Sequence, residues 1–188
     1  MILTRDNEYC AVLDTCVLAP MPLCDTLLRC AEEPALYRVA WSEQTLVELV
    51  RTLEKFGYSE TQARRRVESM RAAFPEASVA VPERMHAAFL PLPDAADAHV
   101  MGAAVLASAQ VIVTWNLRHF PERNVAEYGM LVQSPDEFLL HQFHLAPERM
   151  GEVMDMQASG IGQRGEEILT RLETGLPEFV RAFRAWRR

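Results

Sequence analysis

Short apolar segments that stop at a polar residue restrict the fold of this chain more than any other feature. These segments lie at residues 9–13, 78–81, 111–113 and 130–132. The first ends at Asp14, and the third is followed by Thr114 and Asn116. Short apolar runs bounded by polar turns are typical of buried strands.

Helical patterns occupy the stretches between these segments. Helices are expected over residues 16–31, 43–56, 60–74, 97–109 and 135–144. Ser59 with Gln62, and Ser134 with Glu137, have the spacing of a capping box, and Ser42 precedes a helical apolar pattern. Strands that alternate with helices predict an α/β fold with a central, mainly parallel sheet flanked by helices.

The 188-residue chain is predicted to divide into two parts. Residues 1–144 carry the alternating pattern and are assigned to one domain. Residues 145–188 are helical by pattern, and their last segment places Phe179, Val180 and Phe183 on one face. We therefore expect an α-helical C-terminal extension on an α/β domain.

Five polar residues lie at the predicted element junctions or in an apolar helix. Asp14 and Asn116 follow two strands, Asp97 begins a helix with Asp94 three residues before it, and Glu48 lies within an apolar stretch. Carboxylate oxygens are the ligands that Mg²⁺ and Mn²⁺ prefer, and clustered carboxylates repel one another without a cation. A divalent metal site that supports phosphodiester hydrolysis explains all five together.

Each of these residues also has a purely structural interpretation, which the sequence leaves open. Asp14, Asp94 and Asp97 could be helix caps or first-turn acids, because the helix dipole favours them there. Glu48 could face solvent, and Asn116 could be a turn residue.

At these positions the sequence resembles the PIN-domain ribonucleases, in particular the VapC-type toxins of bacterial toxin–antitoxin pairs. The resemblance spans about residues 9–140 and is strongest in four pieces, residues 12–18, 42–53, 97–100 and 112–121. It implies a Rossmann-like parallel sheet, Mg²⁺ or Mn²⁺ dependence and endoribonuclease activity on RNA. It also implies frequent homodimerisation and inhibition by a small antitoxin protein.

The resemblance also assigns roles to individual residues. It implies that the metal ligands are Asp14, Glu48 and Asp97, with Asp94 as an outer ligand, and that the fourth catalytic polar position is Asn116. One departure is His119, which stands where many relatives carry Asp, and a second metal site is in doubt for that reason.

The candidate substrate contacts are several arginine side chains and Thr114. Arg51 lies one turn beyond Glu48 and is placed to reach either the carboxylates or a substrate phosphate. Thr114, at the end of its strand, is a second candidate for substrate binding. The run from Arg64 to Arg66 could guide RNA, although a solvated helix face explains it as well.

Composition excludes several function classes. The net charge is −7, and all of the acidic excess belongs to the first 144 residues, which argues against non-specific coating by nucleic acid. No apolar run is long enough to span a bilayer, and the first residues lack an export signal, so we expect a cytoplasmic protein without membrane association. The four cysteines lack zinc-site spacing and are expected to be free thiols.

Two alternatives remain on the sequence alone. One is a PIN-like module that binds RNA or an antitoxin but has lost catalysis through changes such as His119. The other is a phosphotransfer receiver or phosphohydrolase with Asp14 as nucleophile. The second class relies on a lysine in the site, and Lys55, which is the one lysine of the chain, lies near a helix end, away from any strand end.

Overall fold

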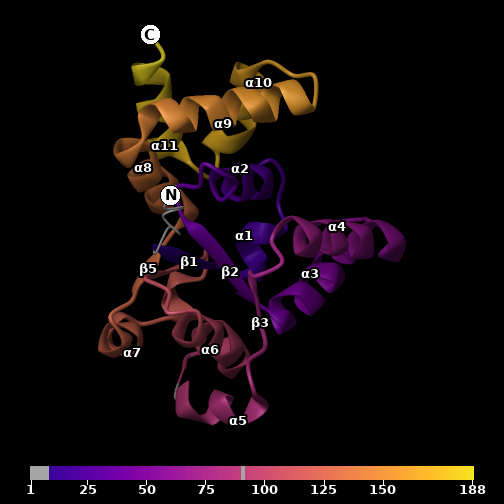
Figure 1. The fold of residues 1–188 in the computed structure, drawn as a ribbon, viewed down its shortest axis with the longest axis vertical. Coiled ribbons are helices and arrows are strands. Elements are labelled where there is room, and N and C mark those ends of the chain that lie inside the picture. The colour runs from indigo at the N-terminus through magenta and orange to yellow at the C-terminus, as the bar shows by residue number, and fades with distance from the viewer. Residues whose placement is uncertain (1–8, 90–91) are drawn as a thin grey trace, which may run out of the picture.

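A five-stranded parallel sheet forms the centre of the fold in the computed structural model, which describes residues 9–89 and 92–188 (Figure 1). The strands are β1 (Cys10–Leu13), β2 (Arg38–Ser42), β3 (Ser78–Val79), β4 (Val111–Val113) and β5 (Leu131–Gln133). Their order is β3-β2-β1-β4-β5, and every neighbouring pair is parallel. The predicted α/β fold with a parallel sheet is confirmed.

Strand β2 was not predicted from the sequence. Its first residue, Arg38, is exposed and the next four are buried, and its apolar run is only Val39-Ala40-Trp41. So short a run carries no clear period on its own. Pairing on both sides, with β1 and with β3, forms the strand.

Helices connect the strands. They are α1 (Thr15–Leu18), α2 (Leu23–Cys30), α3 (Glu43–Lys55), α4 (Glu60–Ala73), α5 (Glu83–His86), α6 (Ala98–Leu106), α7 (Glu122–Val125) and α8 (Pro135–Leu145), with 3-10 turns η1 (Ala87–Phe89), η2 (Ala95–Asp97), η3 (Leu117–His119) and η4 (Ala126–Tyr128). The capping boxes of Ser59 and Ser134 are both formed, and the Ser42 hydroxyl accepts a hydrogen bond from the Thr45 N–H.

One predicted helix is wrong. Residues 16–31 form two helices, α1 and α2, rather than one, and the break lies at residues 19–22. Pro20 and Pro22 stand in the break. Because proline lacks an N–H and its ring clashes with the preceding turn, a continuous helix cannot pass through both positions.

Side chains alternate between two hydrophobic layers along the buried strands. Ala11, Leu13, Val111 and Val113 belong to a core shared with α1–α4 and α8, while Val12 and its neighbours on the other face pack against α6. The sheet is therefore covered by helices on both faces, which buries its central strands completely.

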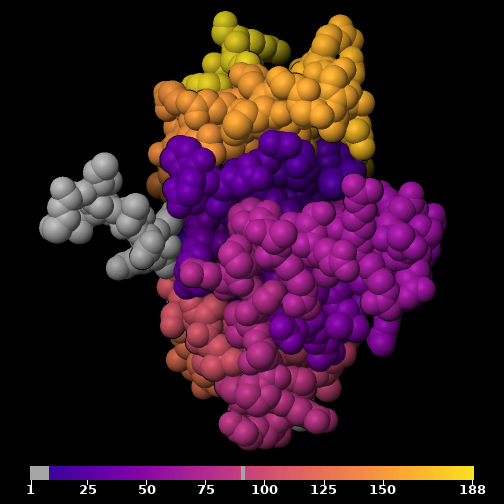
Figure 2. All heavy atoms as spheres, turned by 45° about the vertical axis from the view of Figure 1, so that its right-hand side comes forward, coloured from indigo at the N-terminus to yellow at the C-terminus, as the bar shows by residue number. Residues whose placement is uncertain are grey.

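Residues beyond α8 form the predicted helical extension, with α9 (Pro147–Gly160), α10 (Gly165–Glu173) and α11 (Pro177–Trp186). Helix α9 packs on α2, and α11 packs on α8. Figure 2 shows the extension as a layer lying directly on the α2 region. Because Met150 and Phe179 share one hydrophobic cluster with Leu13 and Leu27, the extension is continuous with the core. The division at residue 144 remains a prediction.

Two further expectations concern cysteines and membranes. All four cysteines are free thiols, as predicted. Over residues 9–89 and 92–188, no helix combines the length and the hydrophobicity that crossing a membrane would demand.

Candidate metal centre

The connections of the sheet reverse direction between β1 and β4, and the first candidate residues lie at this point. The two strands are neighbours with Leu13 opposite Val113, so that Asp14 and Thr114 follow at the same edge of the sheet. The Asp14 N–H donates to the carbonyl oxygen of Val113 at 3.2 Å. Open parallel sheets bind ligands in the crevice at such a switch point.

The Asp14 carboxylate is buried and held by two side chains. The Thr114 hydroxyl donates to Asp14 Oδ2 at 2.6 Å, and the Cys16 thiol donates to the same oxygen at 3.2 Å. Burial, and then the charge of Asp14, raise the pKa of Cys16 to about 12, so this thiol stays protonated. The Trp115 N–H donates to Cys16 Sγ at 3.2 Å. These bonds fix the orientation of the Asp14 carboxylate.

A compact group of metal-ligating side chains forms around Asp97. Carboxylate oxygens of Asp94 and Asp97 and a ring nitrogen of His119 all lie within 4.8 Å of one another. Asp94 caps η2 and Asp97 ends it, whereas His119 ends η3, just beyond β4. The Nδ1 of His119 lies 2.7 Å from Asp97 Oδ2. With an ionised Asp97, this contact places the proton on Nδ1 and leaves Nε2 as an acceptor.

The electrostatics of this group favour a cation. Burial raises the pKa of Asp97, and the charges of Asp14 and Asp94 raise it further, although the hydrogen bond from His119 opposes them. A divalent ion would remove this repulsion, and carboxylate oxygens with one imidazole suit Mg²⁺ or Mn²⁺. The donor set therefore fits the metal that the sequence predicts.

Glu48 extends from α3 and is linked to Asp14 through the neighbouring residue. The Thr15 hydroxyl donates to Glu48 Oε2 at 3.1 Å, and Gln44 Nε2 donates to Oε1 at 3.0 Å. Burial opposes ionisation of Glu48, but the hydrogen bonds from His99, Gln44 and Thr15 outweigh it, and the pKa of Glu48 lies below its usual value. Glu48 is therefore an ionised carboxylate at physiological pH.

A buried histidine connects Glu48 to the start of α3. His99 is 1% exposed; its Nε2 lies 3.2 Å from Glu48 Oε1 and its Nδ1 lies 2.6 Å from Ser42 Oγ. Ser42 Oγ already accepts from the Thr45 N–H at 2.8 Å. This chain of contacts is satisfied when the Ser42 hydroxyl donates to Nδ1 and the Nε2–H donates to Glu48.

The chain is similar in sequence to known proteins. The sequence profile described as PIN domain matches residues 10–118, which is more than half of the chain. The chain belongs to the PIN domain family. It is also 48% identical, over 52 residues, to a Mycobacterium tuberculosis protein named "Putative ribonuclease VapC50". That match covers 28% of this chain and 31% of the relative, so the chain spans about a third of the curated relative. No solved structure matches the chain.

The structure brings two of the predicted site residues of this PIN domain into one compact group and leaves the others outside it. Asp94 and Asp97 lie in the compact group, which within the described residues includes neither Asp14 nor Glu48. Asp14 acts on this group electrostatically, because its charge raises the pKa of Asp97. Asn116 is exposed at the start of η3.

The two predicted substrate contacts differ in their surroundings. Arg51 is exposed and lines the groove between α3 and α4, together with Glu54 and Arg64. Thr114 is fully buried, and its hydroxyl is bonded to Asp14. The structure thus shows Thr114 as a residue that orients a carboxylate. Contact of either residue with RNA remains a prediction.

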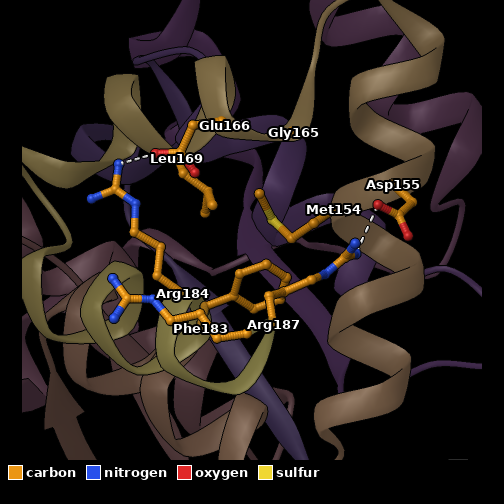
Figure 3. Close-up of a pocket in the computed structure, with 9 residues that line it drawn as sticks. Met154, Asp155, Gly165, Glu166, Leu169, Phe183, Arg184 and Arg187 are labelled. Carbon is orange, nitrogen blue, oxygen red and sulfur yellow. Dashed lines mark ion pairs between the residues drawn. The ribbon is translucent and has the colours of Figure 1, made fainter.

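A cavity of about 530 Å³ lies in the extension, among α9, α10 and α11, and contains none of the PIN-domain site residues. Figure 3 shows that two of the arginines that line it are already paired, Arg184 with Glu166 and Arg187 with Asp155. Arg187 also lies over the Phe183 ring, at 5.4 Å from the centroid. These ion pairs compensate the charges of Arg184 and Arg187, so neither guanidinium is left for an anionic ligand.

Sequence reasoning missed the residues that support the carboxylates. His99, Thr15 and Cys16 appear in the family-like motifs, but only the structure shows their bonds to Glu48 and Asp14. Ser42 was predicted only to precede a helix, and its contact with His99 joins residues that lie 57 positions apart. The one available signal was a histidine within an apolar helical turn, where a buried imidazole needs partners.

Proposed function

We propose that this PIN domain is a metal-dependent endoribonuclease that hydrolyses RNA phosphodiester bonds. The observation that carries the proposal is the group of Asp94, Asp97 and His119, set beside a carboxylate, Asp14, that is oriented at the switch point of the sheet. The family assignment and the ribonuclease name of the relative support it.

In this proposal, Asp14, Glu48, Asp97 and Asp94 hold Mg²⁺ or Mn²⁺, and Asn116 completes the polar set. A bound divalent ion lowers the pKa of water, orients the scissile phosphate and offsets charge on the leaving oxygen. The protein contributes carboxylates held in place before the ion arrives, since the Thr114 hydroxyl fixes Asp14 at 2.6 Å. Such preorganisation is what outer-shell hydrogen bonds supply to metal ligands.

His119 bears on how many ions the centre holds. The resemblance expects an acidic residue here in many relatives, and an imidazole brings no negative charge. The Nδ1 of His119 lies 2.7 Å from Asp97 Oδ2, so His119 orients Asp97 in the manner of a carboxylate–histidine pair. We therefore propose that one ion suffices for catalysis in this protein.

The biological role follows from the same resemblance. We propose that the protein is the toxin of a type II toxin–antitoxin pair, acts in the cytoplasm, forms a homodimer and is inhibited by a small antitoxin. The VapC name of the relative supports the toxin assignment. The competing candidate is a catalytically attenuated module, which the replacement of an acidic residue by His119 favours.

Cleavage of a mixed RNA pool with Mg²⁺, with Mn²⁺ and with EDTA separates the two candidates. We expect cleavage with metal only, and a loss of about 100-fold or more in Asp14→Asn and Asp97→Asn. Asp155→Asn, an exposed carboxylate of α9 paired with Arg187, is the matched control and should cleave normally. Cleavage that survives EDTA, or that both variants retain, excludes the proposal; RNA binding without cleavage in either metal supports the attenuated module.

A further inference from the structure

A second, smaller cavity is lined in part by Trp115, the residue that follows Thr114. It measures about 200 Å³ and lies between residues 20–23, Trp115 and the end of the extension helix α10 with the turn after it. Drug-sized ligands occupy pockets of roughly 300 Å³ or more, so this cavity accommodates a single ring system. Its lining is largely apolar, with Arg171 as the cation.

Trp115 ties this cavity to the carboxylates. It stands between Thr114, which orients Asp14, and Asn116 in the sequence. Its backbone N–H donates to Cys16 Sγ at 3.2 Å, and the same thiol donates to Asp14 Oδ2 at 3.2 Å. The indole is 40% exposed. Trp115 therefore exposes part of an aromatic surface to solvent, while its backbone is linked to Asp14 through the Cys16 thiol.

The extension holds the indole in place through Gly175. A Cβ on this glycine would lie 3.3 Å from both Cη2 and Cζ2 of Trp115, which is tighter than most contacts in proteins allow. The missing side chain lets the ring edge approach the backbone between α10 and α11. The extension thus fixes the ring while part of its surface remains exposed.

Within the described residues, Arg171 lacks the ion pair that most other arginines of the extension form. Arg164 pairs with Glu167, Arg184 with Glu166 and Glu173, and Arg187 with Asp155.

Within the part of the chain that the structure describes, by contrast, no ion pair includes Arg171. Its Nη1 donates only a long hydrogen bond, at 3.5 Å, to Gln163 Oε1. The guanidinium is exposed at the cavity and is not compensated by a carboxylate.

We propose that this cavity is a nucleotide subsite of the nuclease, in which an unpaired base of the RNA stacks on Trp115 and its phosphate binds Arg171. The inference rests on the proposed function and adds to it a place for one nucleotide next to the scissile bond. Bases of single-stranded RNA stack on exposed aromatic rings, and arginine binds the phosphates between them. The subsite requires single-stranded RNA, because a paired base cannot enter a cavity of this size.

The first experiment uses an RNA oligonucleotide that the wild-type protein cleaves, taken from the pool. Each nucleotide in turn is replaced by an abasic residue, and KM and kcat are measured for wild type, Trp115→Phe and Trp115→Ala. One abasic position near the cut should raise the wild-type KM about 10-fold, the size of a lost base stack. Trp115→Ala should raise KM for the intact RNA equally and make it insensitive to that position, whereas Trp115→Phe should retain the sensitivity.

Matched controls separate stacking from general damage. Tyr128→Ala removes an aromatic residue of equal exposure just before β5, at the opposite edge of the sheet. Arg164→Ala removes a paired arginine at the start of α10, whereas Arg171→Ala removes the unpaired one. Only Arg171→Ala should reduce the slope of log Kd against log salt, by about 0.7 for one phosphate on a single strand. Thermal unfolding checks that every variant is folded.

A second experiment keeps the inference testable if the proposed function fails. A pool of single-stranded RNA that contains 5-iodouridine is irradiated with the wild-type protein, and the adducts are mapped by mass spectrometry. An adduct on Trp115 supports the subsite whether or not the pool is cleaved. Unchanged KM values in Trp115→Ala together with no adduct on Trp115 overturn it. If that variant instead weakens only the binding of a protein partner, the cavity is a protein-docking site and the inference is wrong.

Discussion

The Nε2 of His99 lies 3.2 Å from the Oε1 of Glu48, and His99 is buried from solvent. Its other ring nitrogen contacts Ser42 Oγ, at the cap of the helix that carries Glu48. The imidazole therefore connects the start of α3 to a carboxylate six residues further along the chain. Glu48 is thus held by the first turn of α6 as well as by its own helix.

Replacing His99 should change the ionisation of Glu48. The hydrogen bond from His99 lowers the pKa of Glu48, so His99→Ala should raise that pKa and weaken metal binding at low pH. We expect a loss of about 10- to 100-fold in kcat/KM, and an acidic limb of the pH–rate profile that moves to higher pH. His99→Gln keeps a donor and should recover part of the loss, and His141→Ala on α8 is the exposed control. An unmoved acidic limb in His99→Ala contradicts this role.

Removal of the Thr114 hydroxyl should weaken the metal centre without disturbing the packing. Thr114→Val keeps the shape of the side chain but deletes the donor that contacts Asp14 at 2.6 Å. We expect about 10-fold weaker Mg²⁺ activation and a stability loss of about 1–3 kcal/mol, because a buried carboxylate loses a partner. Thr114→Ser should behave as wild type.

The matched control for this change lies on α10. Thr170→Val removes a hydroxyl that contacts only the backbone carbonyl of Glu166 on an exposed helix face. Mg²⁺ titrations of activity compare the variants. Equal activation midpoints in Thr114→Val and wild type would show that Asp14 does not need this donor.

The sequence predicted the parts of the fold that depend on local signals. The caps at Ser42, Ser59 and Ser134 are complete within four residues, and the helices begin where these caps predict. Strand β2 depends on partners on both sides, and the break between α1 and α2 depends on Pro20 and Pro22, whose effect outweighs the helical pattern around them. Signals that need tertiary neighbours are absent from a short window of sequence.

The candidate site also has features that a local sequence pattern predicts and features that depend on tertiary contacts. Asp14 and Asn116 could be placed at one edge of the sheet, because polar residues that follow neighbouring parallel strands meet there. The bond between Ser42 and His99 spans 57 residues, and that between Thr114 and Asp14 spans 100. No spacing rule links such distant positions. His119 was noted as a departure from the family, and only the structure shows that it contacts Asp97.

Divalent metal should stabilise the fold through Asp97. Burial and the charges of Asp14 and Asp94 raise the pKa of Asp97, so the ionised carboxylate destabilises the metal-free protein. We expect Mg²⁺ or Mn²⁺ to raise the Tm of the wild type. Asp97→Asn should raise the metal-free Tm by about 2–4 °C, equivalent to about 1 kcal/mol, and lose most of the metal-induced shift. Asp155→Asn should keep that shift, and a shift of wild-type size in Asp97→Asn argues against metal binding there.

The arginines of α4 should differ sharply in their effect on stability. Arg66 is half-buried, and its Nη2 and Nη1 donate to the carbonyl oxygens of Leu18 and Ala19 at 2.6 and 3.1 Å. These carbonyls end α1, the helix that begins directly after Asp14. The Arg65 side chain is exposed on the same helix.

Arg66→Ala should therefore lower the free energy of unfolding by about 1.5–3 kcal/mol, the range for hydrogen bonds from a charged donor. Arg65→Ala should change it by less than about 0.5 kcal/mol. Urea unfolding followed by circular dichroism measures both values. If Arg66→Ala is as stable as Arg65→Ala but binds RNA more weakly, Arg66 contacts the substrate rather than α1. The predicted result instead assigns Arg66 to the support of the strand end that carries Asp14, and leaves Arg64 and Arg65 as the exposed members of the run.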